Sequence, residues 1–328
     1  MASLFTTLFA PPRRHHLDVI AGMWLPVIVV LFIILFFTFT TDAFMTLRNL
    51  RAISGQASAL LLACLGATFV VLMGSIDLSV GAIVLLVGAI TVNAINALGL
   101  GVEALAVGIL IGALLGTVNG VIFAYGKIPS FVVTLGSLSI FTGAAWELLQ
   151  GRAIRYDSAD FENLAIGQLI PFVQNIGLFA IGAWLMMVFV CFKTRFGRYM
   201  FIIGGGEAVA RTTGIPVRRY KVMAFALSGM MAGLAGALAV ARLGTAGPTL
   251  GQDLLLNSLA AIVVGGTSLS GGVGGVHRTL IGVLIIALLD NGLNLMGVNQ
   301  YSQMMVKGAV VIAAVLVGQD RSKSVVMK

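Results

Sequence analysis

Charged residues and the residues that build catalytic sites are scarce in this sequence. Asp, Glu, Lys and Arg make up 10% of its 328 residues, whereas they make up about a quarter of an average soluble domain. The 2 cysteines, Cys64 and Cys191, both lie in apolar runs, and the 3 histidines have no metal-ligand spacing. The composition therefore excludes a soluble domain, a disulfide framework and a histidine-based metal site.

Motifs that bind nucleotide phosphates are also missing. The one Gly-Lys pair, Gly126-Lys127, is followed by Ile128, and Val121 stands where the pattern GxxxxGK[ST] requires its first glycine. No GxGxxG occurs either. We therefore expect a chain that is not an enzyme, hydrolyses no ATP by itself and carries no cofactor or metal of its own.

Hydrophobic residues are what the sequence has in abundance. They account for 59% of the chain, and the mean hydropathy is +1.05. The apolar runs are long and uniform, which favours membrane helices over the alternating strands of a β-barrel. The net charge of +8 comes from residues between these runs, so it indicates membrane orientation and contact with lipid headgroups rather than nucleic-acid binding.

The sequence predicts an all-α, polytopic membrane protein. The stretch that follows Arg13 and Arg14 is too long for the apolar core of a signal peptide, and no small-residue cleavage site follows it, so we predict that it is the first span. We divide the chain into a cytoplasmic segment 1–18, a permease domain 19–318 and a cytoplasmic tail 319–328. With about twenty apolar residues per span, ten helices are predicted, at 19–40, 53–73, 80–98, 103–126, 130–150, 171–192, 222–241, 255–270, 278–296 and 302–318.

The distribution of positive charge predicts the orientation. Segment 193–221 carries seven Lys and Arg residues against a single acid, Glu207, and short loops rich in Lys and Arg stay in the cytoplasm. Of the 20 Lys and Arg residues, fourteen fall on the side of this segment and of both termini, one, Lys307, lies inside the last span, and five fall on the other side: Arg48, Arg51, Arg152, Arg155 and Arg242. The longest outer loop, 151–171, is either a docking surface for a soluble partner or an ordinary solvated loop.

Glycines recur every four residues in the fourth span, at Gly108, Gly112, Gly116 and Gly120. This spacing places them on one face of a helix, and small residues at such a spacing let two backbones approach closely. A shorter set in the seventh span comprises Gly229, Gly233 and Gly236. We predict that these faces pack against other helices.

Polar residues inside or beside the spans are candidates for a translocation path or gate. Asp77 lies between two apolar runs, where it either caps the third helix together with Ser79 or has a direct role in transport. Asp290 and Lys307 each have apolar neighbours on both sides, but the predicted helices place them at different depths, which argues against direct pairing. The other candidates, which either line a path or bond between helices, are Asn119, Asn291, Asn294 and Gln303.

Six motifs spread from the second span to the ninth resemble the ribose/galactose-type permeases of bacterial ABC sugar importers. They are GSIDLSVG at 74–81, NG at 119–120, IPSFVVTLGSL at 128–138, TRFGRYMFIIGGGEAVARTTGIPV at 194–217, VVGGTSLSGGVGG at 263–275 and NGLNLMGV at 291–298. The chain departs from the family pattern at Gly206 and Val209.

The resemblance implies an assembly of several chains in the inner membrane. Two permease subunits form the membrane core, two ATP-binding subunits dock from the cytoplasm and carry the ATP and Mg²⁺, and a periplasmic sugar-binding protein delivers the substrate. It further implies a segment that couples to the ATP-binding subunit, made of Glu207, Ala208, Ala210, Arg211 and Gly214. The residues themselves favour a short helix after Gly204 to Gly206 that ends at Gly214.

We therefore expect a permease subunit that moves a sugar or polyol inward by alternating access, driven by ATP hydrolysis on a separate subunit. Its partners are an ATP-binding cassette subunit, a periplasmic binding protein, a second permease subunit and the lipid bilayer, without nucleic acid. A branched-chain amino acid ABC permease and an ion-coupled secondary transporter using Asp290 remain open.

Overall fold

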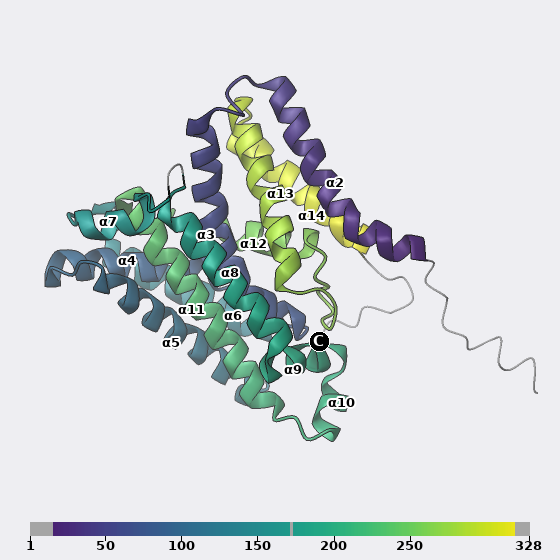
Figure 1. Cartoon of the computed structure of the whole chain (residues 1–328). Coiled ribbons are helices and arrows are strands. Elements are labelled where there is room, and N and C mark those ends of the chain that lie inside the picture. The colour runs from purple at the N-terminus through teal and green to yellow at the C-terminus, as the bar shows by residue number, and fades with distance from the viewer. Residues whose placement is uncertain (1–15, 171–172, 319–328) are drawn as a thin grey trace, which may run out of the picture.

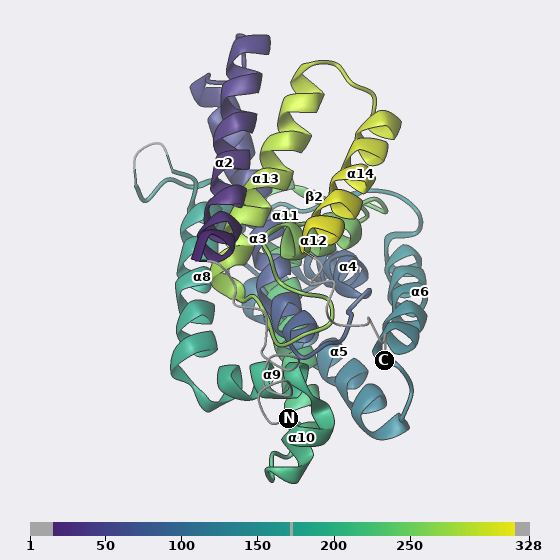
Figure 2. The same ribbon diagram turned by 90° about the vertical axis from the view of Figure 1, so that its right-hand side faces the viewer.

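Helices make up most of the part of the chain that the structure, a computed structural model, describes, residues 16–170 and 173–318 (Figures 1 and 2). Two short strands, β1 (Ile154–Arg155) and β2 (Thr245–Ala246), pair antiparallel. The helices are α2 (His16–Thr40), α3 (Leu47–Leu72), α4 (Val80–Leu98), α5 (Glu103–Gly126), α6 (Ser130–Leu149), α7 (Ala159–Ile166), α8 (Asn175–Lys193), α9 (Arg195–Gly205), α10 (Glu207–Thr212), α11 (Val217–Leu243), α12 (Leu254–Val264), α13 (Val276–Leu295) and α14 (Gln300–Gly318). A polytopic helical membrane protein is confirmed.

Each of the ten predicted spans overlaps one of these helices. Seven helices of the described residues are long and apolar enough to cross a membrane: α3, α4, α5, α6, α8, α11 and α13. The span predicted at 255–270 was wrong at its end, because α12 stops at Val264. Gly266, with a φ of +91°, starts an irregular glycine-rich segment there, so α12 is a short helix of 11 residues.

Two further helices lie where loops were expected. α7 lies within loop 151–171, and α9 precedes α10 within segment 193–221. Both begin at a hydroxyl cap: Ser158 accepts from the N–H of Phe161, and Thr194 accepts from the N–H of Gly197. They are too short and too polar for a search based on twenty apolar residues to find them.

The core consists of α3, α4 and α11, with the other helices around them (Figure 2). Leu62, Leu65 and Phe69 of α3 are completely buried, as expected for a helix that is apolar on all sides. The surrounding helices expose large apolar side chains, such as Leu110 of α5 and Ile140 of α6. These outer faces suit contact with lipid chains or with a second membrane subunit.

The glycine faces of α5 and α11 pack against each other. A methyl group added at Gly112 would overlap the carbonyl oxygen of Gly229, and one added at Gly233 would overlap that of Gly108. Gly116 likewise lies against Phe225 and Gly229, and Gly120 lies against Val222. The two backbones are therefore so close that only glycine fits at the crossing.

The chain between α3 and α4 is not helical although it lies in the interior. Gly74, with a φ of +76°, ends the last turn of α3, and Asp77 and Ser79 of this connection are buried. The carbonyl oxygen of Leu72 accepts from the N–H of Gly272, 2.8 Å away, in the glycine-rich segment before α13. A non-helical backbone at this depth is stable because neighbouring segments supply its hydrogen bonds.

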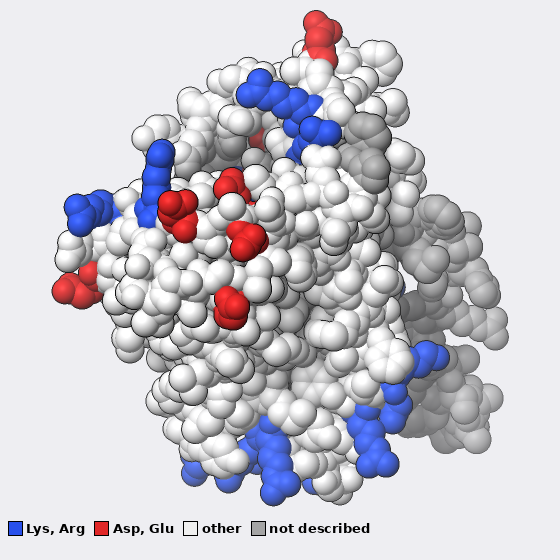
Figure 3. Space-filling view, turned by 60° about the vertical axis from the view of Figure 1, so that its left-hand side comes forward, with Lys and Arg blue, Asp and Glu red and all other residues white. Residues whose placement is uncertain are grey.

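The two ends of the molecule differ in charge. α7 and the β1–β2 pair lie at one end, and α9 and α10 lie at the opposite end (Figure 1). On the face seen in Figure 3, Lys and Arg alone mark the lower end, whereas basic and acidic residues are mixed near the upper end. This separation agrees with the positive-inside pattern of the sequence.

Candidate coupling segment and translocation path

The segment predicted to couple to the ATP-binding subunit forms a short helix, α10, which begins after Gly206 and ends before the turn at Gly214. After α10 the chain turns at Gly214, which has a φ of +79°. The N–H of Ile215 donates to the carbonyl of Ala210, and that of Gly214 donates to the carbonyl of Arg211. These two bonds form a Schellman motif, which requires a residue with positive φ at Gly214.

Glu207 joins α10 to α11. Its carboxylate lies 2.6 Å from Nη2 of Arg211, one turn further along α10, and 3.0 Å from Nζ of Lys221 in α11. Burial raises the pKa of Glu207, but the hydrogen bonds and charges of Arg211 and Lys221 lower it by more, so its pKa lies below the ordinary value. The glutamate is therefore ionised and holds the two helices together.

The other residues predicted for this segment divide between its two faces. Ala210 is fully buried, whereas Ala208 and Arg211 are exposed. Val209, which departs from the family pattern, exposes 63% of its surface. Beside α10 a hollow of about 320 Å³ is lined by Tyr125, Arg211, Pro216, Val217, Arg218 and Arg219. An apolar side chain next to a basic hollow is a suitable surface for another protein chain.

Asp77 lies at the centre of a buried hydrogen-bond chain. Its Oδ1 accepts from the N–H of Ser79 at 3.0 Å and from Oγ of Ser79 at 2.6 Å, and its Oδ2 accepts from Oγ of Ser228 in α11 at 2.8 Å. The cap interpretation therefore needs correction. The carboxylate receives the N–H of the residue before α4 rather than those of its first turn, and it also bonds to a second helix.

The chain of hydrogen bonds continues from Ser79 to residues of α5 and α6. Asn119 donates to Oγ of Ser79 at 2.8 Å, and Ser137 donates to Oδ1 of Asn119. Ser130, at the start of α6, accepts from the N–H of Ile76 at 3.1 Å. Asp77 and Asn119, two of the predicted path residues, thus belong to one network that connects the broken segment to three helices.

Asp290 and Lys307 form an ion pair in which Lys307 is buried and Asp290 is partly buried. Nζ of Lys307 lies 3.2 Å from Oδ1 of Asp290, and Nδ2 of Asn257 in α12 donates to Oδ2 at 3.0 Å. The expectation that different depths keep these two residues apart was wrong. The bounds of α13 and α14 agree with the predicted spans to within two residues, so the error lay in the depth assigned to the two residues and not in the helix bounds.

Asn291 and Asn294 have different surroundings. The side chain of Asn291 exchanges two hydrogen bonds with Asn49 of α3, at 2.8 and 2.9 Å, whereas Asn294 is exposed near the end of α13. Gln303 donates to the carbonyl of Val298. No hydrogen bond in residues 16–170 and 173–318 links these residues to the Asp77 network, so the candidates form separate groups.

Several residues of these groups were not predicted. Ser228 is one hydroxyl in a long apolar helix, and Asn49 and Asn257 lie near the ends of predicted spans, so their types and positions gave no signal. Ser79 was named beforehand as a cap partner of Asp77, whereas Ser130 was marked only by its place in the motif IPSFVVTLGSL.

Comparisons with known proteins agree with this arrangement. Residues 49–315 match the family model described as "Branched-chain amino acid transport system / permease component". The chain is 39% identical over 285 residues to the ribose import permease protein RbsC of Escherichia coli K12, covering 85% of this chain and 88% of RbsC. It is 37% identical over 318 residues to the RbsC protein of Bacillus subtilis, covering 95% and 97% of the two chains.

A third relative, the D-allose transport system permease protein AlsC of Escherichia coli K12, is 34% identical over 300 residues, which are 90% of this chain and 91% of AlsC. No solved structure matches the chain. The family match spans every helix from α3 to α13 and most of α14, including both candidate sites. The chain belongs to this family of transport permease components and is a multi-pass protein of the inner membrane.

Proposed function

We propose that this chain is the membrane-spanning subunit of an ABC importer for a sugar or polyol. It works by alternating access, and ATP is hydrolysed on a separate subunit that docks at α10. The relatives named above transport ribose and D-allose, and the match to them covers nearly the whole chain. A pentose or hexose is therefore the first choice of substrate, although the family description mentions branched-chain amino acids.

One observation carries this proposal: α11 connects the coupling helix to the buried Asp77 network. Lys221 of α11 binds Glu207 of α10, and Ser228 of the same helix donates to Asp77. Residues seven apart lie on the same face of a helix, two turns from each other. A displacement of α10 by the ATPase is therefore transmitted along α11 to the broken segment between α3 and α4.

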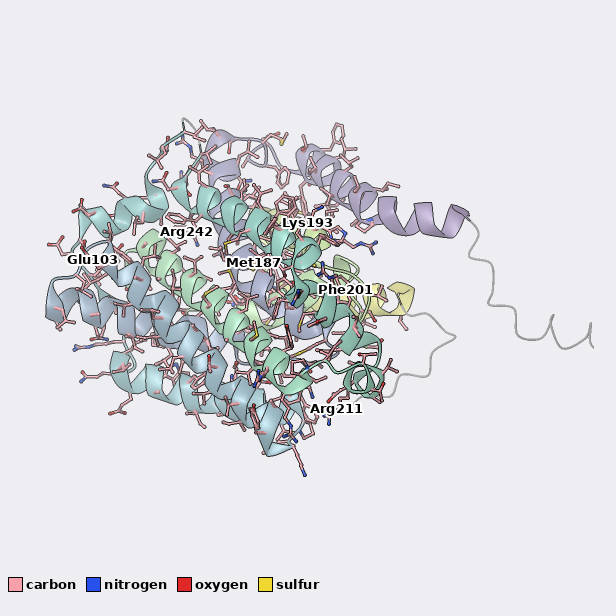
Figure 4. All side chains as sticks on the ribbon, turned by 60° about the horizontal axis from the view of Figure 1, so that its bottom comes forward. Glu103, Met187, Lys193, Phe201, Arg211 and Arg242 are labelled. Atoms are coloured by element: carbon pink, nitrogen blue, oxygen red, sulfur yellow. The ribbon has the colours of Figure 1, made fainter. Side chains whose placement is uncertain are left out.

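The remaining parts of the assembly follow from this orientation. Ten spans, with both termini in the cytoplasm, place α10 on the cytoplasmic side and α7 on the periplasmic side. A second copy of the chain completes the membrane core. The periplasmic partner is a sugar-binding protein, and the chain itself needs no cofactor. Arg211 and Arg242, which are labelled in Figure 4, then lie near the inner and the outer end of α11.

Reconstituted transport tests this proposal. The chain is placed in liposomes with the ATPase and the binding protein expected from the neighbouring genes, and uptake of labelled ribose, allose and leucine is measured with and without ATP. Import of a sugar that needs all three proteins supports the proposal. Uptake that a protonophore abolishes, but that is indifferent to ATP and to the partners, indicates the ion-coupled alternative; import of leucine indicates the amino acid alternative.

The orientation is tested separately. Cys64 and Cys191 are buried, so a single cysteine placed at Ser158 or at Thr212 is the main target for a membrane-impermeant maleimide in intact cells. We expect labelling at position 158 and none at position 212 until the membrane is opened. The reverse pattern would overturn the assigned orientation.

A further inference from the structure

Three arginines line a cleft at the end of the molecule opposite to α10. The cleft has a volume of about 540 Å³ and lies between the start of α3, the end of α7, the chain before α8 and the end of α11. Arg48 and Arg51 come from α3 and Arg242 from α11, while Ile166 and Gln174 complete the wall. Residues almost 200 positions apart in the sequence thus bring three positive charges to one cavity.

These charges have no counter-ion in the described residues. None of the three arginines forms a salt bridge there, and no acidic residue lines the cleft. The Nε atoms of Arg51 and Arg242 are buried and have no hydrogen-bond partner among the described residues. Buried polar groups normally have hydrogen-bond partners. Unpaired guanidinium nitrogens in a cavity therefore indicate that an acceptor of another molecule binds there.

The placement of Arg48 and Arg51 opposes local helix stability. Both lie in the first two turns of α3, which begins at Leu47. The start of a helix carries a partial positive charge and favours acidic residues, whereas basic residues there are unfavourable. α8 also begins next to Gln174, so a second helix start adds to the positive potential of the cleft.

The side chain of Arg242 passes close over Gly55 of α3. A methyl group at Gly55 of α3 would come within 3.1 Å of Cδ of Arg242 and within 3.2 Å of Oε1 of Gln174. Since Gly55 has no side chain, the stem of Arg242 can pass over α3 and reach the cleft. The site is therefore built by α3 and α11 together.

We propose that this cleft receives a carboxylate side chain of the soluble binding protein when that protein docks. The inference rests on the proposed function, which puts the α7 end in the periplasm. A guanidinium group binds a carboxylate through two parallel hydrogen bonds, and three such groups around one cavity suit an acidic side chain better than a neutral sugar.

Charged residues beside the cleft favour one orientation of the docked partner. α7 carries the exposed acids Asp160 and Glu162 within a few residues of Ile166. Basic and acidic groups thus lie near each other at this end of the molecule, as Figure 3 shows for one face. A partner with an acidic side chain for the cleft and a basic one for α7 matches this pattern in a single orientation.

Binding measurements with charge-reversal rescue test the proposal. The permease–ATPase complex in nanodiscs is titrated with the binding protein expected from the neighbouring genes, using wild type and the variants Arg51→Gln, Arg242→Gln and Arg152→Gln. Arg152 is an exposed arginine of the same end outside the cleft, so it controls for net charge. We expect the two cleft variants to lose affinity by about tenfold or more each and Arg152→Gln to change it little.

Two further variants distinguish the position of the Arg242 side chain from its charge. Gly55→Leu keeps every charge but displaces Arg242, so it should weaken binding like Arg242→Gln. Arg242→Glu should abolish binding, and one acid-to-lysine substitution on the binding protein should restore it. Equal affinity of wild type and all cleft variants, with transport intact, would overturn this inference and leave the proposed function standing. Uptake by wild type that never needs a binding protein would instead overturn the proposed function.

A thermal-shift measurement with small anions adds one more outcome. If sodium acetate or sodium phosphate stabilises the wild-type complex but not Arg242→Gln, while affinity for the binding protein is the same in both, the cleft is a site for a free anion. That result would also overturn the docking proposal.

Discussion

The ammonium group of Lys221 lies 3.0 Å from one carboxylate oxygen of Glu207 and 4.4 Å from the centre of the Phe123 ring. Lys221 thereby connects three elements: the short helix α10, the long helix α11 and the last turn of α5. A helix of six residues has little stability of its own, so these contacts make α10 move with α11.

Reversing the charge of Glu207 should uncouple transport from ATP hydrolysis. In Glu207→Arg the new side chain repels both Arg211 and Lys221, and α10 loses its link to α11. We expect the complex to assemble and hydrolyse ATP while uptake falls at least about tenfold, measured side by side in proteoliposomes. Gly214→Trp should act similarly, because tryptophan at a φ of +79° is strained. Normal uptake by both variants would contradict the assignment of α10.

Lowering the pH should weaken the ion pairs that Glu207 forms with Arg211 and Lys221. The pKa of Glu207 is lowered in the folded protein, so the stabilisation that it provides is complete above the pKa of an unfolded glutamate and is lost as the pH falls through the folded, lower value. The link therefore persists at neutral pH. We expect thermal unfolding of wild type and Glu207→Gln to differ at pH 7 and to converge as the pH is lowered below about 4; a constant difference would rule out this ion pair as the cause.

Removing the hydroxyl of Ser228 should impair transport without preventing folding. Ser228→Ala deletes the hydrogen bond by which α11 holds the carboxyl group of Asp77, and a buried polar group left without a partner costs about 1–3 kcal/mol. We expect slower uptake with ATPase activity that no longer responds to substrate. Ser139→Ala is the matched control, because that exposed hydroxyl bonds within its own helix; equal effects of the two variants would argue against a special role for Ser228.

Breaking the ion pair of Asp290 and Lys307 should destabilise the protein more than replacing both residues. Lys307→Met leaves the partly buried carboxylate of Asp290 without its cation, which costs less than the about 3–5 kcal/mol of a fully buried pair but still destabilises the fold. Lys307→Met combined with Asp290→Asn removes both charges and keeps an amide beside Asn257. The double variant should therefore unfold at a higher temperature than either single variant in detergent. If the pair is an ion pathway instead, the double variant should be stable and inactive.

Alanine at Gly112 should destabilise the protein, whereas alanine at Gly143 should not. The methyl group at Gly112 overlaps the backbone of α11, whereas nothing lies within 4 Å of the corresponding position at Gly143 in α6. Overpacking costs about 1–3 kcal/mol, so Gly112→Ala should lower the unfolding temperature. Gly143→Ala should leave it unchanged or raise it, since alanine favours helix over glycine. Similar destabilisation by both would show that the α5–α11 contact is not as close as described.

Long apolar runs were sufficient to predict most helices, because a membrane segment must satisfy its own backbone hydrogen bonds. The same rule did not predict where a backbone group forms its hydrogen bond with a residue far away in the sequence. One case is the carbonyl of Leu72 at the end of α3, which accepts a hydrogen bond from the N–H of Gly272.

The side-chain groups were harder to predict than the helices. Asp77 and Asn119 stood out as polar residues among apolar ones. Ser228, the partner of Asp77, is a common residue type in membrane helices and gave no signal, and Ser137, the partner of Asn119, was marked only by its place in the motif IPSFVVTLGSL. The pairing of Asp290 with Lys307 depends on the relative depth of two helices, and a charge count along the sequence contains no information on depth.

The ion pair also bears on how the chain enters the membrane. α13 ends at Leu295 and α14 begins at Gln300, so these two helices leave the ribosome as one hairpin. A single Asp or Lys at the centre of an inserting helix costs about 2.5–3.5 kcal/mol, and pairing the two removes part of that penalty. We expect α13 to be retained by the translocon until α14 is synthesised, and α14 of the Asp290→Leu variant to insert less efficiently. Glycosylation mapping of truncated chains measures both steps, and insertion of α13 before α14 is made would count against paired entry.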